Sequence, residues 1–311
     1  MEGVCGLPSC INERASHRQA GTIHGEEMID LVTRRQFFGD EIQMCANVRT
    51  PALAEAFAAV PREAFLPPGP WTIRGEGDSF GGSRVTPDAN PRHVQHNVSV
   101  AIDAARQLFN GAPTAVVPAI DALGLTIDSR VLHIGCGLGY YTAVIAHVVG
   151  PQGHVAAVEV DDDLAARASR NLASIGWVTV REGNGAEPLS APIDAILMHA
   201  GVTHPLDTWL DALAPGGRLV CPITASIPQM GPVSKGFMFL ITKRVDDRFD
   251  AQPLSLTVIY TAVDVRDDSL NPIIGAAMMT GMRPRVTRLR RDPHTQEPAC
   301  WLHGPRFCFA Q

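Results

Sequence analysis

Lysine is nearly absent from this chain of 311 residues, in which only Lys235 and Lys243 occur. An amine nucleophile for Schiff-base chemistry therefore has few candidates. The chain also lacks an apolar run approaching the roughly 18 residues of a membrane span. Its first residues do not join a basic segment to an apolar core, as a secretory signal does. These absences predict a cytoplasmic protein with no membrane partner.

The chain has few cysteines and only a modest net charge. Its seven cysteines are an odd number scattered along the sequence, which favours a reducing compartment over a disulfide framework. The formal charge of −6 gives no general affinity for nucleic acid. With 45% hydrophobic residues, the chain is long enough for one sizeable core with appendages or for two small domains. None of these features predicts an oligomeric state.

The most informative segment runs from Arg130 to Ala143. Val131, Leu132 and Ile134 form a short apolar run that is typical of a buried parallel strand, and three glycines follow at alternate positions. Glycines let the backbone turn tightly and approach a ligand. Residues 141–149 then continue at helical spacing. We therefore expect a helix N-terminus beside a bound nucleotide.

Three details indicate which nucleotide this loop accepts. Tyr140 stands where a dinucleotide-binding fingerprint has its third glycine. Residues 131–160 contain neither lysine nor arginine, so the lysine of a P-loop is missing. Glu159 ends the next predicted strand, where a carboxylate can bind ribose hydroxyls. Ribose without phosphate charge predicts S-adenosyl-L-methionine as cofactor, with S-adenosyl-L-homocysteine as its product.

Strands and helices are expected to alternate as in a doubly wound α/β sheet. The predicted strands lie near 130–135, 154–160, 177–181, 193–199, 217–222, 236–243 and 255–263. The predicted helices lie near 26–46, 50–57, 114–125, 141–149, 162–175 and 206–213. Residues 67–92 are rich in Gly, Pro, Asp and Asn, which predicts a loop that acts as a lid or binds the acceptor.

Four segments of the sequence resemble protein-L-isoaspartate O-methyltransferases and their relatives: 60–67, 131–143, 180–185 and 213–222. The glycine loop occurs in many adenosylmethionine enzymes, whereas Val-Pro-Arg-Glu-Ala-Phe at 60–65 is typical of this branch. The resemblance covers roughly residues 47–265. It implies a Rossmann-like, mostly parallel, seven-stranded methyltransferase sheet with N-terminal helices and a C-terminal extension.

Three positions depart from the pattern of that family. His133 stands where the family usually carries an acid, and Gly183-Asn184-Gly185 replaces its Gly-Asp-Gly. Phe109-Asn110-Gly111-Ala112-Pro113 replaces its substrate motif Thr-Ile-Ser-x-Pro. The last change leaves methyl transfer in place but puts isoaspartate itself in doubt. The resemblance therefore implies an acceptor carboxylate on a peptide, a protein or a small molecule.

The predicted cofactor site combines the glycine loop with the ends of the following strands. Amides of the loop would face the methionine carboxylate, aided by the helix dipole. Glu159 would bind the ribose and, by the resemblance, Asn184 would bind the adenine, although it also suits a plain turn. Cys136 is expected as a small loop residue rather than a nucleophile. The predicted cofactor residues are Gly135, Cys136, Gly137, Gly139, Tyr140, Glu159, Val160, Asn184 and Gly185.

His199 is the catalytic candidate because it follows the apolar strand 193–197, and ligands lie beyond the carboxyl ends of such strands. It suits a general base for a hydroxyl or amine acceptor. The alternative is a histidine hydrogen-bonded at the rim of the sheet, and a carboxylate acceptor needs no base. Asn110 and Gly111 stand where the family grips its acceptor, and Arg106 could pair with an acceptor carboxylate. Their alternatives are a turn and a solvated arginine.

The C-terminal tail contains two histidines and two cysteines, His294, Cys300, His303 and Cys308, within fifteen positions. Such a set could bind zinc tetrahedrally. The spacing matches no standard zinc pattern, and Gly304-Pro305 between apolar runs predicts a hairpin turn. No metal is therefore expected. Residues 283–291 alternate arginine with apolar residues and predict a strand with one solvated face.

The sequence thus predicts an S-adenosylmethionine-dependent methyltransferase. Four regions are expected: a flexible arm at 1–22, a helical and loop region at 23–125, the cofactor-binding domain at 126–265 and an extension at 266–311. Two alternatives stay open. One is a cofactor-binding adaptor or peptide-recognition module without catalysis. The other is a nicotinamide oxidoreductase, which Tyr140 disfavours.

Overall fold

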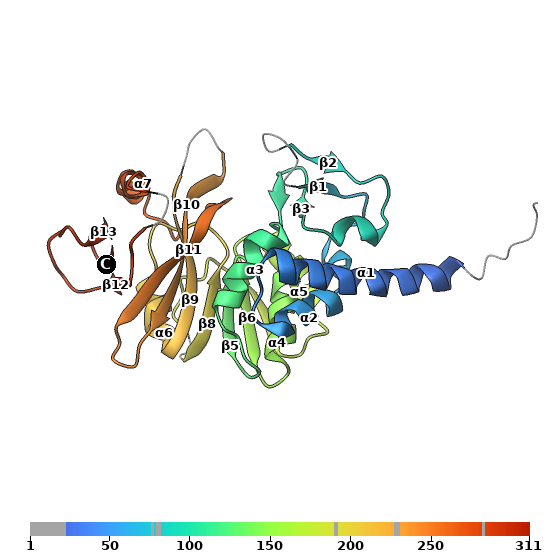
Figure 1. Ribbon diagram of the computed structural model, residues 1–311, viewed down its shortest axis with the longest axis horizontal. Helices are drawn as coiled ribbons and strands as arrows, with labels where there is room; N and C mark the ends of the chain where they lie inside the picture. The colour runs from blue at the N-terminus through green and yellow to red at the C-terminus, as the bar shows by residue number, and fades with distance from the viewer. Residues whose placement is uncertain (1–22, 76–77, 79–81, 190–191, 227–230, 282–283) are drawn as a thin grey trace, which may run out of the picture.

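The centre of the molecule is a ten-stranded sheet with the strand order β13-β14-β12-β11-β10-β9-β8-β5-β6-β7 (Figure 1). The computed structural model describes residues 23–75, 78, 82–189, 192–226, 231–281 and 284–311. The arm expected at 1–22 lies outside the described residues. Within the described part of the chain, no helix is both long and apolar enough to cross a membrane.

One half of this sheet is parallel and carries the alternating pattern expected from the sequence. Its strands are β5 (Arg130–Ile134), β6 (His154–Glu159), β7 (Val178–Glu182), β8 (Ile193–Met198) and β9 (Leu213–Ser226). They pair in parallel, and the helices α4, α5 and α6 provide three of the crossover connections that parallel pairing requires. The expected Rossmann-like α/β sheet is confirmed.

The other half is antiparallel and larger than expected. Its strands are β10 (Val233–Lys243), β11 (Phe249–Tyr260), β12 (Arg288–Arg290), β13 (Cys300–His303) and β14 (Cys308–Ala310). Seven strands, β5 to β11, correspond to the expected seven. The C-terminal extension adds the other three, because Leu289 of β12 pairs with Phe249 of β11 and β14 continues the ladder. The complete sheet is therefore mixed rather than mostly parallel.

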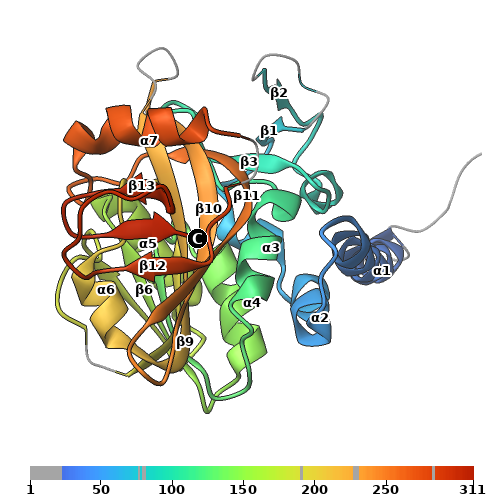
Figure 2. The same cartoon turned by 60° about the vertical axis from the view of Figure 1, so that its left-hand side comes forward.

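Two sets of elements cover the two faces of the sheet. One face packs against α3 (Pro113–Ala122), α4 (Tyr140–Val149) and α5 (Asp162–Leu172), and α1 (Ile23–Cys45) and α2 (Pro51–Ala59) pack on these helices. The other face packs against α6 (Asp207–Ala212), η5 (Asp268–Leu270), α7 (Asn271–Met278) and the extension. Successive strand residues alternate between the two cores, so Val131 faces the first and Leu132 the second. Figure 2 shows α7 beside β13, with which it is in contact.

A second, four-stranded sheet lies beside the main one, in the order β2-β1-β3-β4 (Figure 1). Its strands are β1 (Thr72–Arg74), β2 (Arg84–Val85), β3 (Ser99–Asp103) and β4 (Leu108–Phe109). The same region contains two short helices, η1 (Arg62–Phe65) and η3 (Pro91–Val94). Residues 67–92 are therefore not all loop, as the sequence analysis expected. The two strands in this segment, β1 and β2, are only three and two residues long, too short to show alternation in the sequence. A small core that includes Trp71, Ile73 and Val100 stabilises them.

Candidate active site

A cavity of about 520 Å³ lies beyond the carboxyl ends of β5, β6 and β8. The glycine loop, Glu159 and His199 line this cavity, and Asn110 and Tyr260 are also among its lining residues. Its volume is typical of a small-molecule site. Parallel α/β sheets bind ligands at this edge because loops from neighbouring strands meet there.

The loop after β5 adopts a backbone that favours glycine. Gly135, Gly137 and Gly139 have φ angles of 81°, 56° and 91°, all in the left-handed region. A Cβ on Gly139, which begins α4, would lie 2.7 Å from Cδ1 of Leu172, whereas one on Gly137 would meet only Cδ1 of Ile102 at 3.3 Å. Gly139 is therefore needed for helix packing, and Gly137 keeps the cavity side of the loop open.

Glu159 joins the end of β6 to this glycine loop. Its Oε2 accepts a hydrogen bond from the Gly137 amide at 2.7 Å, and its Oε1 accepts from the amides of Val160 (2.9 Å) and Asp161 (3.2 Å). Burial raises the pKa of the Glu159 carboxyl, and these three amides only partly oppose that effect. The Glu159 side chain is thus held in the cavity wall beside the loop. A carboxylate that binds ribose hydroxyls occupies this position in nucleotide-binding α/β folds.

The remaining predicted cofactor residues divide into two groups. Cys136, Tyr140 and Val160 line the cavity with the glycines and Glu159. Asn184 and Gly185 lie outside its described lining. The Asn184 Oδ1 accepts a hydrogen bond from the Ala186 amide, so the side chain shapes a turn.

Cys136 and Tyr140 are both buried beside the cavity. Burial, together with the nearby Glu159, raises the pKa of the Cys136 thiol, which agrees with a loop residue rather than a nucleophile. The Tyr140 hydroxyl is buried and finds no hydrogen-bond partner among the described residues. Burial also raises the pKa of Tyr140. Its ring packs at 5.9 Å from that of Phe65, which comes from the Val-Pro-Arg-Glu-Ala-Phe segment.

His199 belongs to a histidine pair that the sequence analysis did not recognise. His133 belongs to β5, and His199 directly follows the adjacent strand β8. Their rings stack at 5.6 Å, and His133 Nε2 lies 3.4 Å from His199 Nδ1. Thr142 is the hydrogen-bond partner of the other ring nitrogen of His133. Burial lowers the pKa of His199 to about 4 and that of His133 well below its usual value, so both rings are neutral at neutral pH. The parallel pairing of β5 with β8 could not be read from sequence spacing.

Asn110 and Gly111 line the cavity, and a buried arginine holds them there. The Arg62 guanidinium donates to the carbonyls of Val94 and Val98 and to Asn110 Oδ1, at 2.7 to 3.1 Å. That Oδ1 also accepts from the Val100 amide. The Asn110 amide nitrogen, Nδ2, is buried and has no partner in the part of the chain that the structure describes. It is an unused donor of a residue that lines the cavity.

Arg106, which the sequence analysis considered for the acceptor carboxylate, lies outside the described cavity lining, whereas Arg74 lies within it. Arg106 pairs with Asp103 and with Asp161 at the start of α5, and it is not part of the described cavity lining. Arg74 of β1 is the only arginine or lysine in that described lining, and its guanidinium carbon lies 4.2 Å from the centre of the Phe109 ring. The sequence analysis missed Arg74 because it placed this segment in a loop without fixed neighbours.

Comparisons with known proteins place this chain among a family of methyltransferases. The model of the family "Protein-L-isoaspartate(D-aspartate) O-methyltransferase (PCMT)" matches residues 89–264. A protein-L-isoaspartate O-methyltransferase of Methylorubrum extorquens is 32% identical over 234 residues, which are 73% of this chain and 89% of that protein. One of Ignicoccus hospitalis is 32% identical over 180 residues, 57% of this chain and 75% of that protein.

Two solved structures share the fold. A protein-L-isoaspartate O-methyltransferase aligns with a TM-score of 0.56 and 23% identity, over 82% of this chain and 73% of the other. A putative protein-L-isoaspartate O-methyltransferase from Plasmodium falciparum, in complex with S-adenosyl-L-homocysteine, aligns with a TM-score of 0.53 and 15% identity. That alignment covers 74% of this chain and 98% of the other.

Proposed function

This chain belongs to the protein-L-isoaspartate(D-aspartate) O-methyltransferase family, and from that premise we propose that it methylates a carboxylate of a peptide or protein. Like its family, it is an S-adenosylmethionine-dependent methyltransferase. The family excludes the nicotinamide oxidoreductase that the sequence left open. One observation carries the proposed acceptor class: the glycine loop and Glu159 share a cavity with the unused Asn110 amide and the Arg74 guanidinium.

The cavity residues fit S-adenosylmethionine. A Cβ at Gly137 would project toward Ile102, so glycine leaves room for a ligand close to the backbone. Glu159 offers carboxylate oxygens for ribose hydroxyls, and the N-terminus of α4 offers a dipole for the methionine carboxylate. We further propose that Asn184 and Gly185, which follow β7, lie near the adenine.

The acceptor side carries donors suited to a carboxylate. Asn110 Nδ2 is buried and unpaired among the described residues, and a buried donor gains most from an ionised acceptor. Arg74 supplies the positive charge, which Arg106 cannot because Asp103 and Asp161 already bind it. The aromatic ring of Phe109 orients the Arg74 guanidinium.

The chemistry requires positioning rather than acid–base catalysis. Bound S-adenosylmethionine supplies a methyl group on a sulfonium. A carboxylate acceptor is ionised at neutral pH and needs no base, so Asn110 and Arg74 have only to hold its oxygen in line with that methyl group. We propose that neutral His199 shapes this part of the cavity, and that it would accept a proton only from a hydroxyl or amine acceptor.

Whether isoaspartate is the acceptor depends on the segment 109–113, where this chain departs from its family. An aspartate side chain, an isoaspartate and a chain terminus all present a carboxylate, and we propose that carboxylate class as the acceptor. The five cysteines that the structure describes are free, which agrees with the proposed cytoplasmic location.

Methyl transfer from labelled S-adenosylmethionine to matched peptides tests the proposal. Peptides with aspartate or isoaspartate should take up base-labile label, and their fully amidated counterparts should not. Arg74→Gln should raise KM for the peptide about 10- to 100-fold, since a hydrogen bond to a charged group contributes about 1.5–3 kcal/mol. The exposed Arg92 of η3 provides the control, and Arg92→Gln should leave KM unchanged.

Other outcomes would contradict the proposal in distinct ways. Base-stable label on the amidated peptide would indicate a hydroxyl or amine acceptor and would restore His199 as the general base. Binding of S-adenosylhomocysteine without transfer to any peptide would favour the adaptor alternative.

A further inference from the structure

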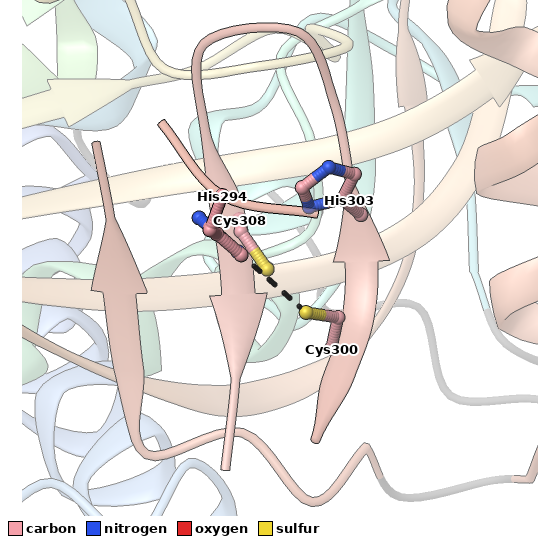
Figure 3. Close-up of side chains that lie close together, drawn as sticks. All are labelled: His294, Cys300, His303 and Cys308. Carbon is pink, nitrogen blue, oxygen red and sulfur yellow. Dashed lines mark hydrogen bonds between the residues drawn. The ribbon is translucent and has the colours of Figure 1, made fainter. Parts of the chain in front are cut away.

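The four side chains of the C-terminal tail that the sequence analysis considered for zinc lie together. They are His294 in the loop after β12, Cys300 and His303 at the two ends of β13, and Cys308 at the start of β14 (Figure 3). Each offers one ligand atom, and these atoms all lie within 4.8 Å of one another. Both cysteines are free.

The pairing of β13 with β14 explains why the spacing in the sequence concealed this cluster. His303 is directly opposite Cys308, and Cys300 is opposite Ala310, so Cys300, His303 and Cys308 share one face of the hairpin. His294 reaches this face from the loop after β12. Residues three apart in a regular strand point to opposite faces. A β-bulge between Cys300 and Leu302 adds one residue and brings Cys300 to the same face as His303.

Neighbouring groups orient these side chains as they do around a metal ion. His294 Nδ1 lies 2.8 Å from the Asp292 carbonyl oxygen, to which it donates. In the neutral ring Nε2 is therefore the nitrogen free to bind a metal, and it faces Cys300 Sγ at 3.7 Å. The Glu297 amide donates to that sulfur at 3.3 Å. Backbone partners of this kind fix the tautomer of a ligating histidine and stabilise a ligating thiolate.

His303 provides an independent indication that this cluster binds a metal ion. Its Nδ1 is buried, and no described residue forms a hydrogen bond with it. Its ring lies 4.7 Å from that of His294 at an angle of 74°, so the two imidazoles approach the cluster from different directions. A buried ring nitrogen without a partner is costly unless something binds it.

We propose that His294, Cys300, His303 and Cys308 bind a zinc ion in a tetrahedral Cys2His2 site. Zinc–sulfur bonds of about 2.3 Å and zinc–nitrogen bonds of about 2.0–2.1 Å place tetrahedral ligands about 3.3–3.8 Å apart. The 3.7 Å between Cys300 Sγ and His294 Nε2 already falls in this range. Two thiolates neutralise the charge of the ion, which suits a partly buried site. Mixed thiolate and imidazole ligands favour zinc over magnesium or calcium.

Four protein ligands leave no open position, so the site is structural rather than catalytic. It joins the loop after β12 to the hairpin of β13 and β14 at the outer edge of the sheet, whereas β5 and the glycine loop belong to the other half. The hairpin also packs inward, since the Trp301 ring lies 5.5 Å from that of Phe239. The zinc ion would therefore tie the hairpin of β13 and β14 to the end of β12, the strand that pairs with β11. The zinc proposal does not depend on the identity of the methyl acceptor.

Metal analysis of the purified full-length chain tests this proposal. The protein should contain about one zinc ion per chain. Cys300→Ser and His294→Gln should each weaken zinc binding by more than about 100-fold in competition with a chromogenic chelator, since even neighbouring groups of a metal site contribute 10- to 100-fold. Cys45→Ser and His147→Gln replace exposed residues of α1 and α4 and should leave zinc content unchanged.

Cobalt substitution keeps the test decisive if the variants fail to fold. Wild-type protein loaded with Co²⁺ should show the intense visible bands of tetrahedral cobalt and a thiolate-to-cobalt charge-transfer band. A weak octahedral spectrum, no metal uptake from added Zn²⁺, or full zinc content in Cys300→Ser would each overturn the proposal. Metal-free protein with a Cys300–Cys308 disulfide would overturn it as well.

Discussion

Gly137 and Gly216 adopt the same left-handed backbone in different surroundings. Their φ angles are 56° and 83°. A Cβ on Gly216 would meet no atom within 4 Å, whereas one on Gly137 would project beside the cavity toward Ile102. Alanine variants at the two positions therefore distinguish the loss of stability caused by a strained backbone from the loss of ligand affinity.

Gly137→Ala and Gly216→Ala should each lower the free energy of unfolding by about 1–2 kcal/mol, because an L side chain is strained in the left-handed region. Only Gly137→Ala should also lose affinity for S-adenosylhomocysteine, by at least about tenfold. Urea denaturation and calorimetric titration measure the two effects. Equal affinity in both variants would show that the loop does not contact the ligand.

The His133–His199 pair predicts how stability depends on pH. A histidine in the unfolded chain has a pKa near 6.5, whereas burial lowers the pKa of His199 to about 4. Between these values the unfolded chain takes up a proton that folded His199 does not, so stability falls as pH decreases from 6.5 to 4. The loss from His199 has an upper limit of about 3.4 kcal/mol.

His199→Gln should flatten this part of the stability curve, while carboxylates contribute equally to both proteins. Urea denaturation at a series of pH values measures the slope. The matched variant His147→Gln removes an exposed histidine from α4 and should keep the slope of the wild type. Parallel curves for His199→Gln and the wild type would contradict a buried neutral imidazole.

At the scale of elements, the short helix η1 anchors the small sheet to the active site. Arg62 is 1% exposed and reaches the carbonyls of Val94, His96 and Val98 as well as Asn110 Oδ1. One side chain thus fixes the path of the chain from η3 to β4. The Val-Pro-Arg-Glu-Ala-Phe segment identified the family in the sequence, and the structure gives its arginine a positioning role.

Arg62→Lys should destabilise the protein by on the order of 3 kcal/mol. Lysine keeps the charge, but its single ammonium cannot match the planar guanidinium, and buried carbonyls lose their donors. Amide hydrogen exchange should increase first in residues 94–111. Arg92→Lys changes an exposed arginine of the same region and should stay within about 0.5 kcal/mol of the wild type. A similarly small effect at Arg62 would argue against the anchor.

For the whole molecule, the C-terminal extension is part of the main hydrophobic core. Phe309 of β14 is fully buried, and its ring lies 4.6 Å from that of Phe239 in β10. It pairs across the sheet with Leu289 and Leu302. The extension should therefore unfold with the rest of the protein.

Phe309→Ala should lower the free energy of unfolding by about 3–5 kcal/mol, because it leaves a large cavity in the core. Chemical denaturation followed by both tryptophan fluorescence and circular dichroism should still give one coincident transition. Val245→Ala, at a side chain 88% exposed, should change stability by less than about 0.5 kcal/mol. Two separate transitions, or an unchanged midpoint for Phe309→Ala, would mean that the extension folds independently.

The sequence by itself determined the features that depend on near neighbours along the chain. The apolar run before Gly135, the helical spacing after it and the acid at Glu159 are local patterns, and they sufficed for the parallel sheet and the cofactor. The hairpin turn at Gly304-Pro305 was likewise predicted and is confirmed, since the Gly304 amide donates to the Phe307 carbonyl.

Only the tertiary structure decided which distant residues meet. Strand pairing brought His133 to His199, and the small sheet brought Arg74 to the cavity instead of Arg106. A single β-bulge placed Cys300 on the same face as His303. Such meetings depend on register and on contacts between elements far apart in the chain, and local periodicity carries no information about either.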